Sequence, residues 1–440
     1  MLDNKLSAED FSISNLGKPG KNSPLIKEKE LFVSETQKIT YSADIEEISS
    51  FIKQGKELPC FEMAGPRKKI FFDSEKINCA IVTCGGLCPG INDVIRAIVY
   101  ESYSRYKVKK VYGFRYGYQG MVKKNNIKPI VLDTDMVNEI HEKGGTMLGS
   151  SRGSQNKDEM VDYLQELKIS VLFAIGGDGT LRGASAIATK IKERNLNISV
   201  IGIPKTIDND ISYIEQTFGF ETAVEEARAA IQSAHIESKG AENGVGLVKL
   251  MGRDSGFIAA QATLANADVN FCLIPEVPFI LTGKKGLLPL IKKRLIKRRH
   301  AVIVVAEGAG QNLIEEDQEL LKERRKDASG NNLHKDIGVF LKDKITSYFK
   351  DNGFPATIKY IDPSYIIRSK PANANDSIFC LQIGQNAVHA GMAGKTDMLV
   401  SYWNHNYTHV PIKLATSSRK KIDPEERLWR TVLSMTDNYK

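Results

Sequence analysis

The sequence VLFAIGGDGTLRGASAIATKI, at residues 171–191, indicates the class of the fold. Its first five residues are apolar, which is typical of a strand that is buried on both faces. A glycine-rich turn follows at residues 176–180, and residues 181–191 have the periodicity of an amphipathic helix. A buried strand that passes through a tight turn directly into a helix is typical of α/β proteins.

The same alternation of buried strands and amphipathic helices continues on both sides of this stretch. Strands are predicted at residues 77–84, 107–114, 171–175, 198–203, 245–250 and 301–305, and helices at residues 91–100, 181–191, 219–234, 256–265 and 337–349. We therefore expect an α/β fold with mostly parallel sheets that are flanked by helices. The length of 440 residues suggests two or three domains.

Composition excludes several classes of protein. Hydrophobic residues make up 42% of the chain and charged residues 26%, so the chain can form a large core and is not disordered. No apolar run reaches the roughly 18 residues of a membrane-spanning helix, and the polar N-terminus lacks the apolar centre of a secretory signal. Six cysteines do not make a disulfide scaffold, so we expect a cytoplasmic protein.

The formal net charge of +8 suits either nucleic acid or small anionic substrates such as phosphates. The densest basic run is KKRLIKRR at residues 292–299, between an apolar stretch and a predicted strand. This position favours the last turn of a helix, where cations interact well with the helix dipole. A basic binding module is the alternative. Because no aromatic residues alternate with these cations, we expect no nucleic-acid partner.

Two glycine-rich turns each connect a strand to a helix and are candidates for phosphate binding. Residues 84–92 read CGGLCPGIN, and residues 176–180 read GGDGT. Glycines let the backbone approach a phosphate, and the helix N-terminus adds amide donors and positive potential. Asp178 adds a carboxylate that can hold Mg²⁺ directly or through water. GGDG also occurs in NAD kinases and diacylglycerol kinases, so this motif alone indicates only a nucleotide phosphate.

Residues 204–210, PKTIDND, place two carboxylates at the end of a predicted strand, where open α/β sheets bind ligands. Asp208 and Asp210 point in similar directions if the turn is extended. One of them can then act as a general base that the other supports. The alternative interpretation is an ordinary turn that is rich in Asp and Asn.

Three more turns carry a charged residue that suits an anionic or sugar ligand. Arg152 lies in GSSRG, Arg253 follows the strand at residues 245–250, and Glu307 follows the strand at residues 301–305. Arginine at a strand end suits phosphate because its guanidinium group binds in a bidentate geometry. Each of these signals is weak when it is taken alone.

Three other patterns are predicted to bind no ligand. Residues 391–396, GMAGKT, look like a Walker A loop, but His389 stands where glycine is needed and a strand follows instead of a helix. His405 and His409 have the spacing of helical metal ligands, but their neighbours favour a strand or a loop. Cys84 and Cys88 have no second close pair of cysteines or histidines, so we interpret them as core or turn residues.

Taken in order, GGLCPGIN, GSSRG, GGDGT, PKTIDND and MGRDSGFIA resemble the motifs of the 6-phosphofructokinase family, and AEGAGQ and YIDPSYIIRS continue the match. The resemblance runs from about residue 77 to about residue 368. It implies two similar three-layer α/β domains with mostly parallel sheets and the active site in the cleft between them. It also implies transfer of a phosphoryl group to the 1-hydroxyl of fructose 6-phosphate.

The resemblance implies roles for individual residues. Asp208 looks like the general base, and Asp178 looks like the Mg²⁺ site. Nucleotide binding is implied for Gly86, Arg152, Gly153, Gly177, Asp178, Gly179 and Thr180. Binding of the sugar phosphate is implied for Thr206, Ile207, Asp208, Met251, Gly252, Arg253, Glu307, Tyr365, Ile366, Ile367 and Arg368. The implied catalytic set is Asp208, Thr206, Asp210 and Arg253.

The phosphoryl donor depends on which branch of the family the chain resembles. Lys205, Leu87, Tyr365 and Gly244 depart from the short allosteric bacterial pattern and resemble the pyrophosphate-dependent branch and its long-chain ATP-dependent relatives. In the pyrophosphate-dependent branch, the position that corresponds to Gly179 resembles Asp. A carboxylate at this position would crowd and repel the α-phosphate of ATP. Gly179 together with Lys205 therefore indicates an ATP-dependent enzyme, with a pyrophosphate–fructose 6-phosphate phosphotransferase as the alternative.

The resemblance also suggests how the chain is divided. We expect an N-terminal extension at residues 1–75, a nucleotide-binding domain at 76–205, a sugar-phosphate-binding domain at 206–370 and a segment that completes both domains at 371–440. Residues 311–335 are highly charged and are expected to form an exposed excursion. The family implies ATP and fructose 6-phosphate as substrates, and a dimer or tetramer as the assembly.

Overall fold

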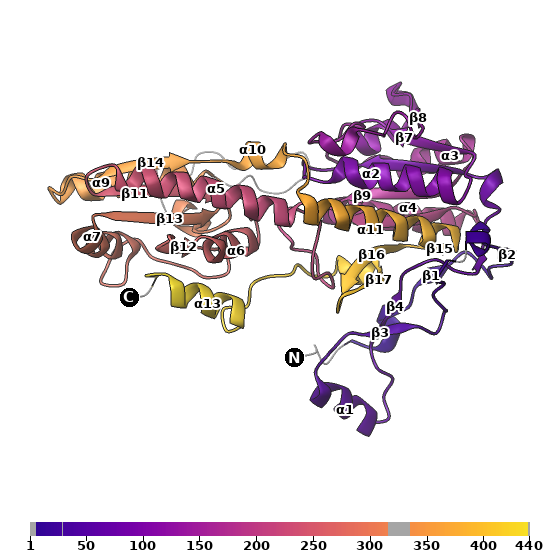
Figure 1. Ribbon diagram of the computed structural model, residues 1–440, viewed down its shortest axis with the longest axis horizontal. Helices are drawn as coiled ribbons and strands as arrows, with labels where there is room; N and C mark the ends of the chain where they lie inside the picture. The colour runs from indigo at the N-terminus through magenta and orange to yellow at the C-terminus, as the bar shows by residue number, and fades with distance from the viewer. Residues whose placement is uncertain (1–5, 29, 316–334, 439–440) are drawn as a thin grey trace. The chain divides into compact units, whose positions relative to one another are not determined.

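The computed structural model describes residues 6–28, 30–315 and 335–438, and the chain divides into two compact units (Figure 1). Unit 1 comprises Met1–Thr206, Ile211–Gly219 and Lys370–Ser418. Unit 2 comprises Ile207–Asp210, Phe220–Ser369 and Arg419–Lys440. The chain therefore passes repeatedly from one unit to the other, and each unit is assembled from several separate stretches.

Unit 1 contains a nine-stranded sheet whose five central strands, β16, β10, β9, β6 and β7, are parallel. In sheet order the strands are β3 (Lys38–Thr40), β4 (Cys60–Met63), β17 (Asn406–Pro411), β16 (Met398–Trp403), β10 (Ser199–Pro204), β9 (Ile169–Gly176), β6 (Asn78–Thr83), β7 (Lys110–Phe114) and β8 (Ile130–Leu132). All residues of β10 are buried, as expected for a strand with helices on both faces.

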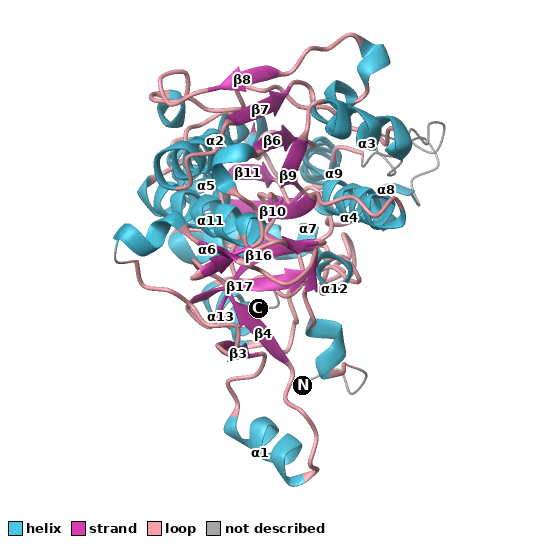
Figure 2. Ribbon diagram, turned by 90° about the vertical axis from the view of Figure 1, so that its right-hand side faces the viewer, coloured by secondary structure: helices cyan, strands magenta, loops and turns pink. Residues whose placement is uncertain are grey.

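Helices cover both faces of this sheet, so unit 1 has three layers. Figure 2 shows α2 (Ile91–Tyr100) and α11 (Ala374–Met392) on one side, and α3 (Lys157–Glu166) and α4 (Asp178–Glu193) on the other. Two shorter helices, α1 (Ile45–Lys53) and α12 (Ile412–Ala415), also belong to unit 1. Gly384 lets α11 approach α2 closely, because an added Cβ would lie 2.6 Å from the Cβ of Ala97.

The N-terminal stretch is part of unit 1. It supplies β3 and β4 to the large sheet, and its short strands β1 (Ser14–Asn15) and β2 (Lys21–Asn22) pair with β15 (Lys395–Thr396) and β5 (Lys69–Ile70). The ring of Phe11 packs against Phe61 at a centroid distance of 4.9 Å. Two acceptors hold the ammonium group of Lys395, namely Glu35 and Glu62, each at 2.8 Å. Apolar and ionic contacts therefore both fix this stretch.

Unit 2 is built on a four-stranded parallel sheet in the order β12 (Phe271–Leu273), β13 (His300–Ala306), β11 (Gly244–Leu250) and β14 (Thr357–Ile361). Its helices are α5 (Phe220–Lys239), α6 (Phe257–Ala265), α7 (Leu287–Arg298), α8 (Gln311–Glu315), α9 (Ile337–Asp351), α10 (Ser364–Arg368) and α13 (Arg427–Met435). Val245 and Leu247 share a core with α7 and α9, whereas Gly246 faces Ala234 of α5. Side chains alternate along a strand, so helices cover both faces here too.

The structure confirms the predicted α/β class with mostly parallel sheets, and each predicted strand and helix is present with small shifts at its ends. The basic run at residues 292–299 forms the end of α7, as predicted. The predicted excursion at residues 311–335 begins in α8, and residues 316–334 lie outside the described residues. Among the helices that the structure describes, none combines the length and the apolar character needed to span a bilayer.

Candidate active site

Three neighbouring strands of unit 1 lead into the loops that carry the predicted nucleotide motifs. β6 precedes CGGLCPGIN, β9 precedes GGDGT, and β10 precedes the Lys205–Thr206 pair. Since these strands are parallel neighbours, their carboxyl ends lie at one edge of the sheet, where open α/β sheets bind ligands. Helices α2 and α4 begin directly after the first two loops and direct their N-termini toward this edge.

The loop at residues 149–153 lies against the first glycine-rich loop. The N–H of Gly85 donates to the carbonyl oxygen of Ser151 at 3.0 Å, and Ser150 Oγ donates back to the carbonyl oxygen of Gly85 at 2.7 Å. An added Cβ at Gly86 would lie 3.5 Å from Nη2 of Arg152. The structure therefore brings Gly86 and the predicted phosphate-binding Arg152 together. The adjacent Gly153 has a φ of 97°, which favours glycine.

Lys205 connects this pair of loops to the GGDGT loop. Its Nζ donates to the carbonyl oxygen of Gly86 at 2.8 Å, and its backbone N–H donates to the carbonyl oxygen of Gly176 at 3.0 Å. An added Cβ at Gly177 would lie 3.3 Å from the carbonyl oxygen of Lys205. The glycine-rich loops and one buried cation therefore form a continuous cluster within unit 1.

The GGDGT loop closes tightly and leaves space at one position. The N–H of Thr180 donates to the carbonyl oxygen of Gly177 at 2.9 Å, and Asp178 opens helix α4. The Asp178 carboxylate pairs with Arg182 at 2.7 Å, one helical turn later. Apart from its neighbours in the chain and the adjacent backbone of α4, no atom lies within 4 Å of a Cβ added at Gly179, and Gly179 is not among the residues with positive φ. A side chain at position 179 would therefore extend into open space.

The PKTIDND turn carries its two carboxylates in unit 2, although the residues before and after this stretch belong to unit 1. The turn is not extended, because Asn209 adopts a left-handed conformation with φ of 54°. The prediction that Asp208 and Asp210 point in similar directions required an extended turn, and the structure does not have one. Asn is among the few residues that tolerate this conformation. The two carboxylates still influence each other electrostatically.

The electrostatic environment of Asp208 is that of a carboxyl group that holds its proton. The pKa of Asp208 is raised to about 8, with desolvation of the carboxyl group as the largest cause and the nearby charges of Asp210 and Glu307 as further causes. The guanidinium group of Arg368 and a hydrogen bond with the backbone of Arg253 act in the opposite direction. The structure thus groups five predicted site residues within unit 2.

Two turns of unit 2 hold Arg253 and Glu307 through their backbones. The N–H of Glu307 donates to the carbonyl oxygen of Leu250 at 2.9 Å, and the N–H of Gly308 donates to that of Gly252 at 3.0 Å. An added Cβ at Gly308 would lie only 1.8 Å from the carbonyl oxygen of Arg253, so only glycine fits there. Met251 is buried, and Gly252 has a φ of 123°.

Helix α10 carries the last group of predicted residues. Ile367 is buried, and Arg368 is close enough to Asp208 to lower its pKa. Tyr365 and Ile366, however, are 82% and 61% exposed, so both side chains face solvent. Lys249 of β11 positions the start of this helix through an ion pair of 2.8 Å with Asp362. No sequence motif had singled out Lys249.

The Walker-A-like stretch and the His405/His409 pair, which were predicted to bind no ligand, have the expected secondary structure. Residues 391–396 run from the end of α11 into β15, and β16 follows, so no helix begins where a Walker A loop would need one. His409 lies on β17 with Nδ1 3.0 Å from Oε1 of Glu62, and His405 lies in the preceding turn. Cys84 and Cys88 are buried core residues. In the described part of the chain, no group of three His, Cys, Asp or Glu side chains is arranged to hold a metal ion.

Comparison with protein-family models shows that residues 78–391 match the phosphofructokinase model. The chain belongs to the phosphofructokinase family. This match spans every motif from CGGLCPGIN to YIDPSYIIRS, and so it includes both the glycine-rich loops of unit 1 and the Asp208 group of unit 2. The family prediction made from the order of motifs is confirmed.

Relatives within the phosphofructokinase family match over nearly the whole chain. An ATP-dependent 6-phosphofructokinase of Borreliella burgdorferi is 49% identical, with 97% of this chain and 96% of the relative covered. The enzyme of the same name from Amycolatopsis methanolica is 45% identical over 92% of this chain and 88% of the relative. The Trypanosoma brucei brucei enzyme is 48% identical over 85% of this chain and 76% of the relative.

Solved structures of the phosphofructokinase family share the fold. A pyrophosphate-dependent phosphofructokinase from Marinobacter aquaeolei superposes with a TM-score of 0.65 at 20% identity, covering 79% of this chain and 86% of that chain. The Pichia pastoris phosphofructokinase gives a TM-score of 0.62 at 22% identity, covering 78% of this chain and 35% of that chain. At these identities the comparison establishes the two-domain architecture.

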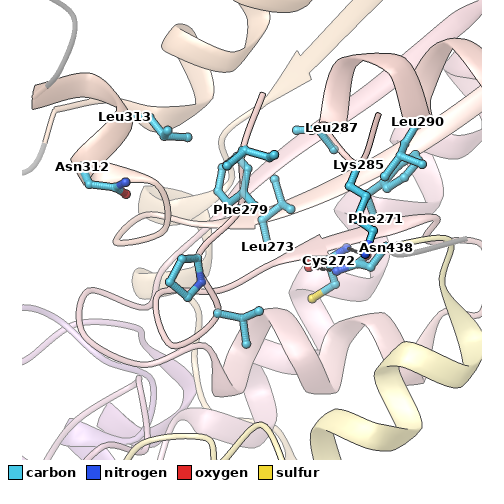
Figure 3. Close-up of a pocket in the computed structure, with 13 residues that line it drawn as sticks. Phe271, Cys272, Leu273, Phe279, Lys285, Leu287, Leu290, Asn312, Leu313 and Asn438 are labelled. Carbon is cyan, nitrogen blue, oxygen red and sulfur yellow. Dashed lines mark hydrogen bonds between the residues drawn. The ribbon is translucent and has the colours of Figure 1, made fainter. Parts of the chain in front are cut away.

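A pocket of unit 2 contains none of the predicted site residues (Figure 3). Its volume is about 330 Å³, and its lining is mostly apolar, including Phe271, Phe279 and Leu287. At its rim the side chain of Asn438 donates to the carbonyl oxygen of Cys272 at 2.7 Å and accepts from the N–H of Cys272 at 2.9 Å. The pocket is therefore separate from the charged group around Asp208.

Proposed function

We propose that the chain is an ATP-dependent 6-phosphofructokinase. It transfers the γ-phosphoryl group of ATP to the 1-hydroxyl of fructose 6-phosphate, giving fructose 1,6-bisphosphate and ADP. The observation that carries the proposal is the partly buried Asp208 carboxyl group, which lies in the turn after β10 and is influenced by Asp210, Glu307, Arg368 and the backbone of Arg253. The names of relatives that are 44–49% identical over most of the chain agree with this activity.

Unit 1 binds the nucleotide in this proposal. Gly86, Gly177 and Gly179 let the backbone approach the phosphates, and the N-termini of α2 and α4 supply amide donors. Arg152 provides a planar group for a phosphate oxygen, and Lys205 provides a point charge on the same loops. The nucleotide set is Gly86, Arg152, Gly153, Gly177, Asp178, Gly179 and Thr180.

Asp178 is the protein ligand for Mg²⁺ in this proposal. Carboxylate oxygen suits this hard cation, which commonly binds through one or two carboxylates together with water and phosphate oxygens. The Asp178 side chain lies at the first residue of α4 and is partly accessible, so the residues present fit the ion. When bound, Mg²⁺ neutralises charge on the phosphates.

Unit 2 binds the sugar phosphate and carries the base. Arg253 and Arg368 are the cations that neutralise phosphoryl charge, and Glu307 is an acceptor for sugar hydroxyls. Asp208 takes the proton of the 1-hydroxyl, and a pKa near the working pH suits a general base. The remaining contacts are assigned to Ile207, Asp210, Met251, Gly252, Tyr365, Ile366 and Ile367 of unit 2, and Thr206 of unit 1 is assigned to the same substrate. We further propose a cytoplasmic homo-oligomer, either a dimer or a tetramer.

The test is a donor assay on the purified protein. Fructose 6-phosphate and Mg²⁺ are supplied with ATP in one series and with pyrophosphate in the other, and formation of fructose 1,6-bisphosphate is measured. We expect turnover with ATP and little with pyrophosphate. Turnover in the pyrophosphate series without turnover in the ATP series would contradict the proposal. It would establish a pyrophosphate–fructose 6-phosphate phosphotransferase as the function. That alternative is favoured by Lys205, which resembles the pyrophosphate branch.

A further inference from the structure

One cation that no motif identified joins the two carboxylate-bearing turns of unit 2. Nη1 of Arg419 lies 3.1 Å from Oδ2 of Asp210 and 2.5 Å from Oδ2 of Asp254. Asp210 is two residues after the proposed base, and Asp254 directly follows Arg253. A single guanidinium group therefore connects the turn of the base to the turn of the proposed phosphate-binding arginine.

The backbone around Arg419 holds the same two turns. The N–H of Lys420 donates to the carbonyl oxygen of Asp210 at 2.9 Å. The N–H groups of Ile422 and Gly256 both donate to Oε1 of Glu276, each at 3.0 Å. Arg419, Lys420 and Ile422, which we name the C-terminal clamp, are thus fixed to the base turn on one side and to the start of α6 on the other.

The charges around Asp208 determine what the C-terminal clamp does to the reaction. The groups with the largest effects on the Asp208 carboxyl include Asp210, Glu307, Arg368 and the backbone of Arg253. The side chain of Asp210 is only 10% exposed, so water screens its charge poorly, and the guanidinium group of Arg419 pairs with it at 3.1 Å. Without this cation, Asp210 would repel a second negative charge on Asp208 more strongly.

We propose that Arg419 is a positioning residue for phosphoryl transfer: it fixes Asp210 and balances its charge, so that Asp208 can release its proton and accept that of the sugar hydroxyl. This inference rests on the proposed function, because it assigns a step to Asp208 as the base. Arg419 acts through Asp210. Its role therefore concerns the pH dependence and rate of the reaction more than the binding of ATP.

The experiment compares the pH profiles of kcat/KM for fructose 6-phosphate in four proteins: wild type, Arg419→Gln, Arg419→Lys and Lys421→Gln. In Arg419→Gln we expect the acid limb to move upward by on the order of half a pH unit, so kcat/KM at neutral pH should fall about threefold. KM for ATP should stay within about twofold. Arg419→Lys keeps the positive charge, so the acid limb of its pH profile should lie at the wild-type position. Lys421 is exposed, so Lys421→Gln removes an equal charge and should match wild type.

Several outcomes would overturn the proposal. A fall in kcat/KM of equal size at every pH, with the limb unmoved, would indicate that Arg419 only stabilises the fold. An equal shift in Lys421→Gln would show a general charge effect. If Arg419→Gln does not fold, Asp254→Asn takes its place: it removes the carboxylate that competes for Arg419, so the limb should move to lower pH. An unmoved limb in that variant would contradict the inference.

A further pair of variants separates this inference from the proposed function. In an Asp210→Asn background, Arg419→Gln should no longer move the acid limb, because the charge that Arg419 balances is gone. If Asp208→Asn keeps wild-type turnover, the assignment of the base itself is wrong. If Asp208→Asn is inactive and Arg419→Gln behaves as wild type, the base stands and only the role of Arg419 fails.

Discussion

The ammonium group of Lys205 donates a hydrogen bond of 2.8 Å to the carbonyl oxygen of Gly86, so the loop after β10 is tied to the loop after β6. The Lys205 side chain is only 6% exposed, and its charge therefore lies among the glycine-rich loops instead of in solvent. A cation at this position favours a polyphosphate of either kind. Selection between ATP and pyrophosphate must then come from another residue of the same cluster, and Gly179 is the candidate.

Gly179→Asp is expected to lower kcat/KM for ATP at least about tenfold, which corresponds to a loss of about 1.4 kcal/mol. The free protein should tolerate the change, because a Cβ at this position meets no atom within 4 Å apart from its chain neighbours and the adjacent backbone of α4. The carboxylate would instead crowd and repel the α-phosphate of ATP. Pyrophosphate has no α-phosphate ester, ribose or base, so its use should be spared or should appear.

Gly179→Ala is the matched control for that variant. It adds the Cβ without the charge, and it should retain most of the ATP activity. Steady-state kinetics with ATP and with pyrophosphate measure both variants. If Gly179→Asp uses ATP as well as wild type does, Gly179 does not select the donor.

Asp208→Asn is expected to reduce kcat by roughly 10²–10⁴-fold, the usual effect of losing a general base. The unfolding free energy should be equal or higher. The pKa of Asp208 is raised to about 8, with desolvation of the carboxyl group as the largest cause, so the folded state disfavours the ionised form that the unfolded chain adopts above its ordinary pKa. That cost grows as the pH rises toward 8, and Asn removes it. Urea unfolding at pH 6 and pH 8, together with turnover, checks both expectations. A folded variant with wild-type turnover would exclude Asp208 as the base.

Arg253→Ala is expected to lower kcat/KM for fructose 6-phosphate by roughly 10–150-fold, through loss of a charge-assisted contact of about 1.5–3 kcal/mol. The backbone around it should stay in place, because it is the carbonyl of Arg253 that packs against Gly308. Kinetics with each substrate varied in turn give the measurement. If only the dependence on ATP changes, Arg253 has been assigned to the wrong substrate.

Glu62→Gln is expected to destabilise the protein by roughly 3 kcal/mol near neutral pH, because it removes one partner of a buried ionic network. Burial alone would raise the pKa of Glu62, but the hydrogen bond to His409 and the charge of Lys395 lower it to about 2. A lowered pKa means that the stabilisation is fully present above the ordinary pKa of 4.5 and is lost as the pH falls toward 2. The difference from wild type should therefore be constant from pH 6 to 8 and should shrink below about pH 4.5.

Glu57→Gln is the control for this prediction. Glu57 also pairs with a lysine, Lys38, but at 3.9 Å and with both side chains largely exposed. An exposed pair of this kind contributes at most about 1 kcal/mol. Denaturant unfolding of the two variants across pH measures the contrast. Equal effects would show that the burial of the Glu62 network adds no stability.

The strands, the helices that follow them and the loops between them could be predicted from the sequence, because each depends on local pattern. A run of apolar residues and a glycine-rich turn are sufficient to place β9 and the start of α4. The order of several such motifs then identified the family. Arg152 and Gly86 could be assigned to one site for the same reason, since each lies in a motif.

Other features could not be predicted from the sequence, because they depend on contacts between distant residues or on a single backbone angle. The left-handed conformation of Asn209 changes the directions of the two carboxylates beside it, and nothing in PKTIDND excludes an extended turn. Arg419 pairs with Asp210 across 209 positions of sequence, and no local pattern reports such a pair. The short strands β1 to β5 have two to four residues each, too few for a periodicity to be visible.

The four-residue stretch Ile207–Asp210 belongs to unit 2 while its neighbours in sequence belong to unit 1, and Arg419 begins a further separate stretch of unit 2. As a result, no continuous fragment of the gene encodes unit 2 alone. A fragment spanning Phe220–Ser369 would lack both the proposed base and the cation that pairs with Asp210. A single cut of the chain therefore cannot yield two fragments that each contain one complete unit.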